Sequence, residues 1–311
     1  MAARTRLHVV TGKGGTGKTT VAGALALALA ADGGQVLLME VEGRQAIAGL
    51  FGREPLPTGE HLVAETPGGG QVRAITVDAE DALLEYLEMF YRLGVAGRAL
   101  RKVGAVDFAT TIAPGMRDVL LTGKVKEAAT RTSGGRRVYD AVVLDAPPTG
   151  RIGRFLNVTA ETARLAKVGP IKSHSDGVAA ILRSPLTAVH LVTLLEEMPV
   201  QETVDALAEL RRLGIPVGRL VINAAAAPAG IGKITQAGVR RGLLSAGLPA
   251  DKVTVAGLVA QGRAEAARVA VEVALRAELA ALGRPTVELP ALPGVDRAGL
   301  EQLAELLVPA A

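Results

Sequence analysis

The sequence has no cysteine and no tryptophan, and aromatic residues make up only 2% of its 311 residues. Without cysteine the chain can form no disulfide bond, no thiolate site for zinc or a metalloid, and no cysteine-ligated iron–sulfur cluster. A core with so few aromatic side chains has to be built from Ala, Val, Leu and Ile, which the 49% hydrophobic content supplies. A chain of this length can form one large α/β core or two modest domains.

Long runs of like charge are also missing. The net charge is only +4 and comes from scattered arginines, so we expect no nucleic-acid partner. The N-terminus leads straight into an apolar strand pattern without a signal peptide, and the most apolar helix pattern is too short to cross a bilayer. These features predict a cytoplasmic protein, at most peripheral to the membrane.

Strand and helix patterns alternate along most of the chain, which favours a mostly parallel sheet covered by helices on both faces. The expected strands are residues 7–10, 35–41, 72–77, 138–144, 188–193, 217–223, 253–258 and 286–289. The expected helices are residues 21–31, 201–213, 235–246, 262–282 and 296–307. We therefore predict an α/β fold in which residues 1–311 form a single domain.

The alternation stops at residues 79–134, which look helical without an intervening strand. Apolar residues recur there at helical spacing, as in Leu83, Leu87 and Tyr91. The segment is either a helical subdomain that exposes an apolar groove for a client or partner, or ordinary helices packed on the sheet. A second stretch, residues 169–185, looks irregular, and we expect it to join the same face.

The most informative stretch is Gly12-Lys13-Gly14-Gly15-Thr16-Gly17-Lys18-Thr19-Thr20, between a strand and a helix pattern. Its glycines allow backbone N–H groups to turn toward an anion, and the helix that follows directs its positive end at the same place. Lys18 adds a full charge, and Thr19 offers a hydroxyl to the Mg²⁺ that accompanies a nucleoside triphosphate. The residues expected to bind ATP here are Gly12, Lys13, Gly14, Gly15, Thr16, Gly17, Lys18, Thr19 and Thr20.

A second motif, Asp145-Ala146-Pro147-Pro148-Thr149-Gly150, follows an apolar strand. An acidic residue at the end of that strand can hold Mg²⁺ through its water shell, as the second carboxylate of phosphate-loop ATPases does. Pro147 and Gly150 belong to a stiff turn whose backbone can register the γ-phosphate. We therefore predict Thr19 and Asp145 as the magnesium residues.

Three other places complete the candidate site. Glu40 and Glu42 close a strand, and either carboxylate can hold the attacking water; we assign that role to Glu42. Asn223 ends another strand, where its amide can read an adenine edge. Pro290 and Ala291 are expected to form the other wall of the base pocket. The histidines show no metal spacing, and His8 and His190 lie inside strand patterns, as core or edge histidines do.

These motifs together resemble those of the ArsA-type ATPases. The loop sequence around Lys13 is similar to the deviant Walker A loop of the SIMIBI class, which also includes the tail-anchored-protein targeting ATPase, MinD, ParA and nitrogenase reductase. The segment around Asp145 resembles the family's switch II, residues 110–115 resemble its A-P-G segment, and residues 191–203 are also family-like. The V-E-G-R-Q phrase resembles the actinobacterial branch, whose members are loosely named anion-transporting ATPases.

The resemblance implies a dimer in which Lys13 reaches the partner subunit's phosphates, so that Lys13, Lys18 and Glu42 are the catalytic candidates. The dimer can be a homodimer or a heterodimer with a paralogue, and its nucleotide state is expected to reshape a helical face for a protein client or membrane-associated partner. Glu42 stands where the family has Asp, so turnover is expected to be slow. Two alternatives remain open: a MinD/ParA-like positioning ATPase, and an ATP-bound, non-hydrolysing partner of a paralogue.

Overall fold

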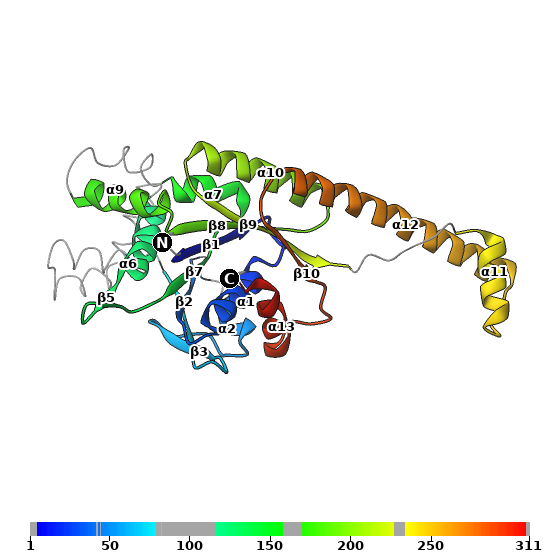
Figure 1. Ribbon diagram of the computed structural model, residues 1–311, viewed down its shortest axis with the longest axis horizontal. Coiled ribbons are helices and arrows are strands. Elements are labelled where there is room, and N and C mark those ends of the chain that lie inside the picture. The colour runs from blue at the N-terminus through cyan, green and yellow to red at the C-terminus, as the bar shows by residue number, and fades with distance from the viewer. Residues whose placement is uncertain are drawn as a thin grey trace, which may run out of the picture.

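The computed structural model describes residues 5–41, 43, 45–78, 82, 116–157, 170–226 and 234–308. Its centre is an eight-stranded sheet with the strand order β10-β9-β8-β1-β7-β2-β4-β3, in which all neighbours pair parallel except β3 and β4 (Figure 1). The strands are β1 (Leu7–Gly12), β2 (Gln35–Glu40), β3 (His61–Glu65), β4 (Gln71–Thr76), β7 (Ala141–Asp145), β8 (Thr187–Thr193), β9 (Val217–Ala225) and β10 (Thr286–Pro290). The predicted α/β fold with a mostly parallel sheet is confirmed.

Helices cover both faces of the sheet, which buries its strands on two sides. One face carries α1 (Lys18–Ala30), α2 (Ala46–Leu50) and α13 (Arg297–Leu307). The other face carries α6 (Met116–Thr130), α7 (Thr149–Leu156), α9 (Pro170–Leu182) and α10 (Glu197–Arg212). The central strands are accordingly buried on both faces and mainly apolar, without the strict alternation of a half-exposed sheet, as is typical of buried parallel strands.

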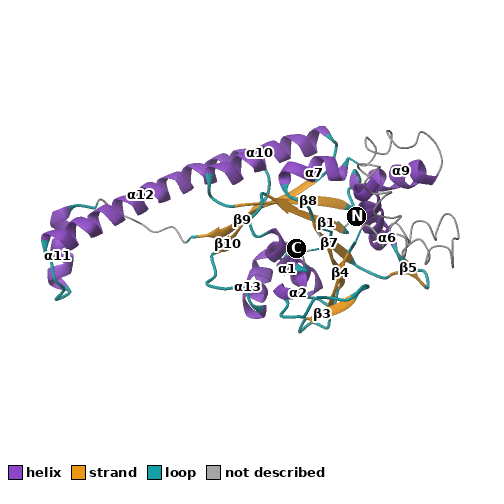
Figure 2. Ribbon diagram, turned by 180° about the vertical axis from the view of Figure 1, so that it is seen from behind, coloured by secondary structure: helices purple, strands orange, loops and turns teal. Residues whose placement is uncertain are grey.

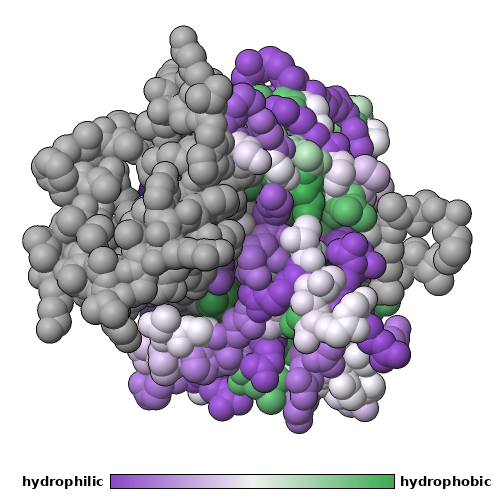
Figure 3. Space-filling view, turned by 90° about the vertical axis from the view of Figure 1, so that its left-hand side faces the viewer, coloured by the Kyte–Doolittle hydropathy of each residue, from purple (hydrophilic) through white to green (hydrophobic). Residues whose placement is uncertain are grey.

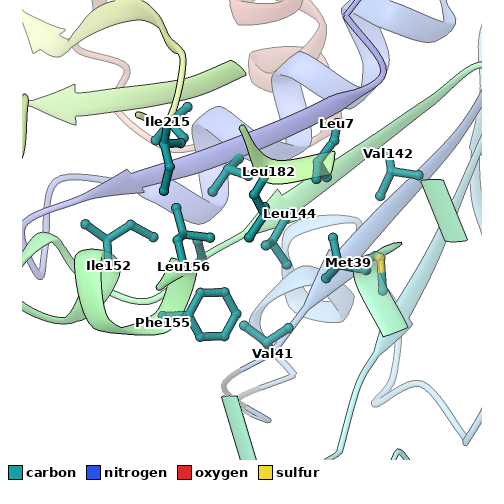
Figure 4. Packing of buried hydrophobic residues seen from close by; sticks show 14 of the residues in the cluster. Leu7, Met39, Val41, Val142, Leu144, Ile152, Phe155, Leu156, Leu182 and Ile215 are labelled. Carbon is teal, nitrogen blue, oxygen red and sulfur yellow. The ribbon is translucent and has the colours of Figure 1, made fainter. Parts of the chain in front are cut away.

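The core on the α7 side is built mainly from aliphatic residues, with the ring of Phe155 packed among them. Phe155 and Ile152 of α7 are at most 1% exposed, and Figure 4 shows Phe155 directed toward Val41 at the end of β2, near Met39. Leu144 of β7 lies beside Leu156 in the same cluster. This packing fixes α7, and with it the turn that precedes α7, against the carboxyl ends of β2 and β7.

Two helices form an arm that projects from the sheet. α12 (Lys252–Ala281) packs by its last turns on the body through Leu275 and Leu279, and its first part extends beyond the sheet toward α11 (Gln236–Ser245) (Figure 1, Figure 2). α11 has no buried residue. We call α11 together with the first part of α12, residues 236–265, the arm.

Several sequence-based expectations were wrong. Residues 253–258, expected as a strand, are helical and lie in α12, because the Asp251 carboxylate caps the helix by accepting hydrogen bonds from Val253 N (2.9 Å) and Thr254 N (3.0 Å). The stretch 169–185, expected to be irregular, contains α9. The antiparallel strand β3 was missed altogether.

The proposed helical insert lies largely outside the described residues. The described part of residues 79–134 consists of Ala82, α6 and the start of a two-residue hairpin, β5 (Thr132–Ser133) with β6 (Arg136–Arg137). β5 contradicts the expectation of an insert without strands. On the side seen in Figure 3, the described surface is mainly hydrophilic. Among the described residues we find no helix that combines the length and the apolar character of a membrane span.

Candidate nucleotide-binding site

The loop between β1 and α1 has the backbone conformation that its glycines allow. Gly15 and Gly17 have φ values of 88° and 83°, in the left-handed region that L side chains rarely adopt. A Cβ on Gly12 would lie 2.1 Å from the carbonyl oxygen of Val192 on the neighbouring strand β8. Each of these glycines is therefore required by the shape of the loop, and α1 begins directly after it at Lys18.

Hydrogen bonds inside the loop hold its lysine and threonine side chains close to the backbone. The carbonyl oxygen of Lys13 accepts from Thr16 Oγ1 (2.8 Å) and from Lys18 Nζ (3.4 Å). The Lys18 ammonium thus lies over the loop, at the positive end of α1. Backbone N–H groups, a helix N-terminus and a cation are gathered at one place, which is the arrangement that binds an anion such as a phosphate.

The two residues predicted to hold magnesium, Thr19 and Asp145, are in contact at the start of α1. The Thr19 hydroxyl donates to Asp145 Oδ2 over 2.6 Å. Asp145 ends β7 and pairs in register with Val10 of β1, so the two strands bring the carboxylate to the loop. A hydroxyl and a carboxylate in contact form the hard-oxygen set that Mg²⁺ prefers. These residues therefore fit the metal that accompanies a nucleotide.

The segment after Asp145 is fixed to the loop strand from one side and to α10 from the other. Thr11 Oγ1 donates to the carbonyl oxygen of Pro147 (2.6 Å), and Thr149 Oγ1 donates to Glu202 Oε2 (2.6 Å). Pro148 occupies the N-cap position of α7. Gly150, in the first turn of α7, is exposed, and a Cβ there would meet no atom within 4 Å.

Glu202 is a site residue to which the sequence analysis gave no role. Its Oε1 lies 3.4 Å from Lys13 Nζ, while its Oε2 accepts from Thr149. One carboxylate on α10 thus joins the phosphate loop to the turn before α7. Glu202 lies in the family-like stretch 191–203, but only the fold shows that α10 brings it to Lys13.

Of the two strand-ending glutamates, Glu40 and Glu42, the structure describes only Glu40. Glu40 is 2% exposed, and its two oxygens accept from Ala46 N (3.2 Å) and Ile47 N (3.4 Å) at the start of α2. A carboxylate at a helix N-terminus is stabilised by the unpaired N–H groups there. Glu40 therefore caps a helix. Glu42, the predicted water-positioning residue, lies outside the described residues.

The side chain of Asn223 is hydrogen-bonded to the phosphate loop. Its Nδ2 donates to the carbonyl oxygen of Thr16 (2.9 Å), and a Cβ on Gly17 would lie 2.3 Å from the same nitrogen. Pro290 ends β10 and pairs with Ala225 of β9, and Ala291, the next residue, donates from its N to Ala225 O (3.2 Å). All three predicted base-pocket residues thus lie at the carboxyl ends of neighbouring strands, and the role of each in reading a base stays a prediction.

Comparisons with known proteins agree with this geometry. The family model described as "Anion-transporting ATPase" (ArsA ATPase) matches residues 5–176. ATPase BagA of Mycobacterium tuberculosis is 51% identical over 313 residues, covering 97% of this chain and 92% of BagA. A relative from Aquifex aeolicus, provisionally named arsenical pump-driving ATPase 2, is 25% identical; the match covers 70% of this chain and 79% of the relative. ATPase GET3 of Kluyveromyces lactis is 25% identical; the match covers 69% of this chain and 70% of GET3.

Proposed function

This chain belongs to the ArsA family of ATPases, and on that premise we propose that it is a dimeric ATPase whose nucleotide state controls the binding of a protein partner. The observation that carries the proposal is the contact between Thr19 and Asp145 beside the glycine loop. It supports ATP and Mg²⁺ as the ligands, since the hydroxyl and the carboxylate are joined where a helix N-terminus and Lys18 attract phosphate.

The chain's own residues then have distinct tasks. The loop amides and Lys18 hold the β- and γ-phosphates, and Thr19 and Asp145 hold the metal or its water shell. Bound Mg²⁺ neutralises phosphate charge as it develops during hydrolysis. The turn from Pro147 to Gly150 registers the γ-phosphate.

Glu42 is the proposed water-positioning residue. Glu40 supports this assignment by elimination, because both of its oxygens already cap α2. The longer arm of Glu, compared with the family's Asp, displaces the carboxylate by about an ångström. Misplacement on that scale costs as much as roughly 10²-fold in rate, so slow turnover is expected.

The proposal of a dimer depends on the role of Lys13. In the family-based proposal each Lys13 reaches the triphosphate bound by the partner subunit. Its side chain is only 31% exposed and pairs with Glu202 in the single chain, so it has to leave that carboxylate to reach a phosphate. The second subunit can be another copy of this chain or a paralogue.

The arm is the described element that best suits a helical partner-binding face. Leu244 and Leu248 are 60% and 53% exposed, and Val253 is 83% exposed. Apolar side chains that gather on an unsupported helical extension mark an interaction surface. We therefore assign the partner-binding face to the arm, while the equivalent proposal for residues 79–134 lies mostly outside the described residues.

The test compares the purified wild-type protein with Lys18→Ala and Glu42→Gln, using Lys252→Ala on the arm as the matched loss of a surface lysine. We expect Mg²⁺-dependent phosphate release from the wild type and from Lys252→Ala. Lys18→Ala should bind nucleotide at least about tenfold more weakly, because losing a charge-assisted hydrogen bond costs about 1.5–3 kcal/mol. Glu42→Gln should bind normally without turnover.

Other outcomes separate the alternatives. A wild type that binds ATP without hydrolysing it, alone and with its paralogue, would favour the non-hydrolysing partner. ATP-dependent binding to lipid vesicles or to DNA would favour the MinD/ParA-like alternative. Normal turnover by Lys13→Ala as a strict monomer would refute the role of Lys13 across a dimer. No nucleotide binding at all would refute the proposed function.

A further inference from the structure

A cavity of about 430 Å³ lies near the amino-terminal ends of the strands, away from the phosphate loop. Its wall on one side is α1, and on the other side are the beginnings of β1, β8 and β9. The apolar part of the lining includes Val21, Leu25 and Leu29 from α1, Val217 and Val221 from β9, and Leu307 from α13. Its volume lies within the range of about 300–1,000 Å³ that is typical of small-molecule sites.

Two arginines line the cavity, and none of the described residues in its lining is acidic. Arg219 Nη1 donates to the carbonyl oxygen of Leu307 (3.0 Å), and Arg284 Nη1 donates to that of Val217 (3.1 Å). Among the ion pairs of the described residues, neither arginine has a carboxylate partner. Arg284 Nε is buried with no hydrogen-bond partner. A buried guanidinium donor without an acceptor is costly, and a bound anion would satisfy it.

His8 and His190 form a stacked pair that also lines the cavity, and the donor and acceptor of the hydrogen bond between them can be assigned. The rings of His8 and His190 are 5.4 Å apart and nearly parallel, with His8 Nδ1 3.1 Å from His190 Nε2. His190 stays neutral, because burial, with smaller contributions from His8 and Arg219, lowers its pKa to about 3. Arg219 N donates to His190 Nδ1 (3.2 Å). His190 therefore carries its hydrogen on Nε2 and donates to His8 Nδ1.

The cavity thus combines cationic donors with aliphatic walls. Gly218 keeps room beside the pair, since a Cβ there would lie 2.8 Å from His190 Cε1. A lining of donors without a carboxylate selects for negative charge, and the walls select for an apolar body.

We propose that this cavity binds an amphipathic monocarboxylate, with its apolar body between α1 and β9 and its carboxylate on Arg219 and Arg284. Guanidinium groups match the planar carboxylate and bind it through two parallel hydrogen bonds. The site is separate from the phosphate loop, so the proposal does not depend on ATP hydrolysis.

The test uses octanoate as the probe, titrated into the full-length protein below its critical micelle concentration and followed by calorimetry. Octan-1-ol and octylamine share the apolar chain but lack the negative charge. We expect saturable binding of octanoate at one site, with no comparable binding of the other two. Octanoate should bind equally well to Lys18→Ala, because the phosphate loop is not involved.

Two variants address the cavity from different sides. Arg284→Gln removes one of the two cations, and Leu29→Glu adds a negative charge to the apolar wall without changing either arginine. Each should weaken octanoate at least about tenfold, while Arg240→Gln on the exposed α11 serves as the matched control and should change nothing. Circular dichroism on each variant verifies folding, and Leu29→Glu carries the test if Arg284→Gln does not fold. Absence of octanoate binding, equal binding of octylamine, or unchanged affinity in the folded variants would overturn the proposal.

Discussion

Replacing Glu202 by glutamine should strengthen nucleotide-dependent dimerisation. Glu202 holds Lys13 by an ion pair of 3.4 Å, and at the same time accepts from the Thr149 hydroxyl over 2.6 Å. Glutamine retains an amide oxygen that can accept from Thr149, but it no longer carries the charge that attracts Lys13. The substitution therefore releases the lysine and leaves the start of α7 in place.

The size of the effect follows from the exposure of the pair. The two side chains are 31% and 32% exposed, so the pair is partly exposed to solvent, and ion pairs at the protein surface contribute about 0.2–1 kcal/mol. A homodimer releases two such pairs, so the free energy gained is about 0.4–2 kcal/mol, or about 2- to 30-fold in the dimer dissociation constant. The gain should shrink at high salt, because ions screen partly exposed charges.

Sedimentation velocity with Mg²⁺ and a slowly hydrolysed ATP analogue measures the dimer directly. Glu197→Gln, an exposed glutamate in the first turn of α10, is the matched control and should leave the dissociation constant unchanged. In a Lys13→Ala background Glu202→Gln should have no effect, since the interaction that it removes is already lost. An equal gain in that background, or no gain at low salt, would refute the reasoning.

Three further outcomes follow from the same contacts. Gly17→Ala forces a side chain into the left-handed region and toward Asn223; it should lower the unfolding free energy by about 1–3 kcal/mol in urea titrations and weaken nucleotide binding. Asp145→Asn should abolish the Mg²⁺ dependence of ATP binding, which titrations with and without the metal compare. The pKa of Glu127 lies below its ordinary value of about 4.5; burial opposes this shift, while the hydrogen bond and charge of Arg131 produce it. Because that pKa is depressed on folding, the stabilisation is present above pH 4.5 and lost as the pH falls below it, so the unfolding free energy of Glu127→Gln should depend less on pH in this range.

The fold could be predicted where local sequence and tertiary context favour the same structure. β1, the glycine loop and α1 follow one another as an apolar strand, a turn that needs positive φ, and a buried alanine-rich helix. Residues 253–258 show the opposite case. Their short apolar run with β-branched residues fits a strand as well as a helix, and the signal that decides is the single capping residue Asp251.

In the candidate site, too, some residues could be recognised from the sequence and others could not. The phosphate loop and Asp145 are recognisable from the sequence because each belongs to a short motif. In each motif, the residue types and their spacing indicate the chemistry. The helix-capping role of Glu40 was not recognisable, because a strand-ending carboxylate looks the same whether it faces a nucleotide or the start of α2. Glu202 was not assigned for another reason: its contact with Lys13 joins residues far apart in the chain.

Glu202 also bears on the proposed role of Lys13 across a dimer. Within the single chain, Lys13 and Lys18 are both near the loop, yet they have different surroundings: Lys18 Nζ donates to the carbonyl oxygen of Lys13, whereas Lys13 Nζ faces a carboxylate on α10. A lysine held by a carboxylate outside the loop contributes little to binding an anion inside it. The ion pair is weak enough for a second subunit's phosphates to replace it, since a triphosphate carries more charge than one glutamate. In the proposed dimer, Lys13 would therefore act only after it leaves Glu202 for the partner's phosphates.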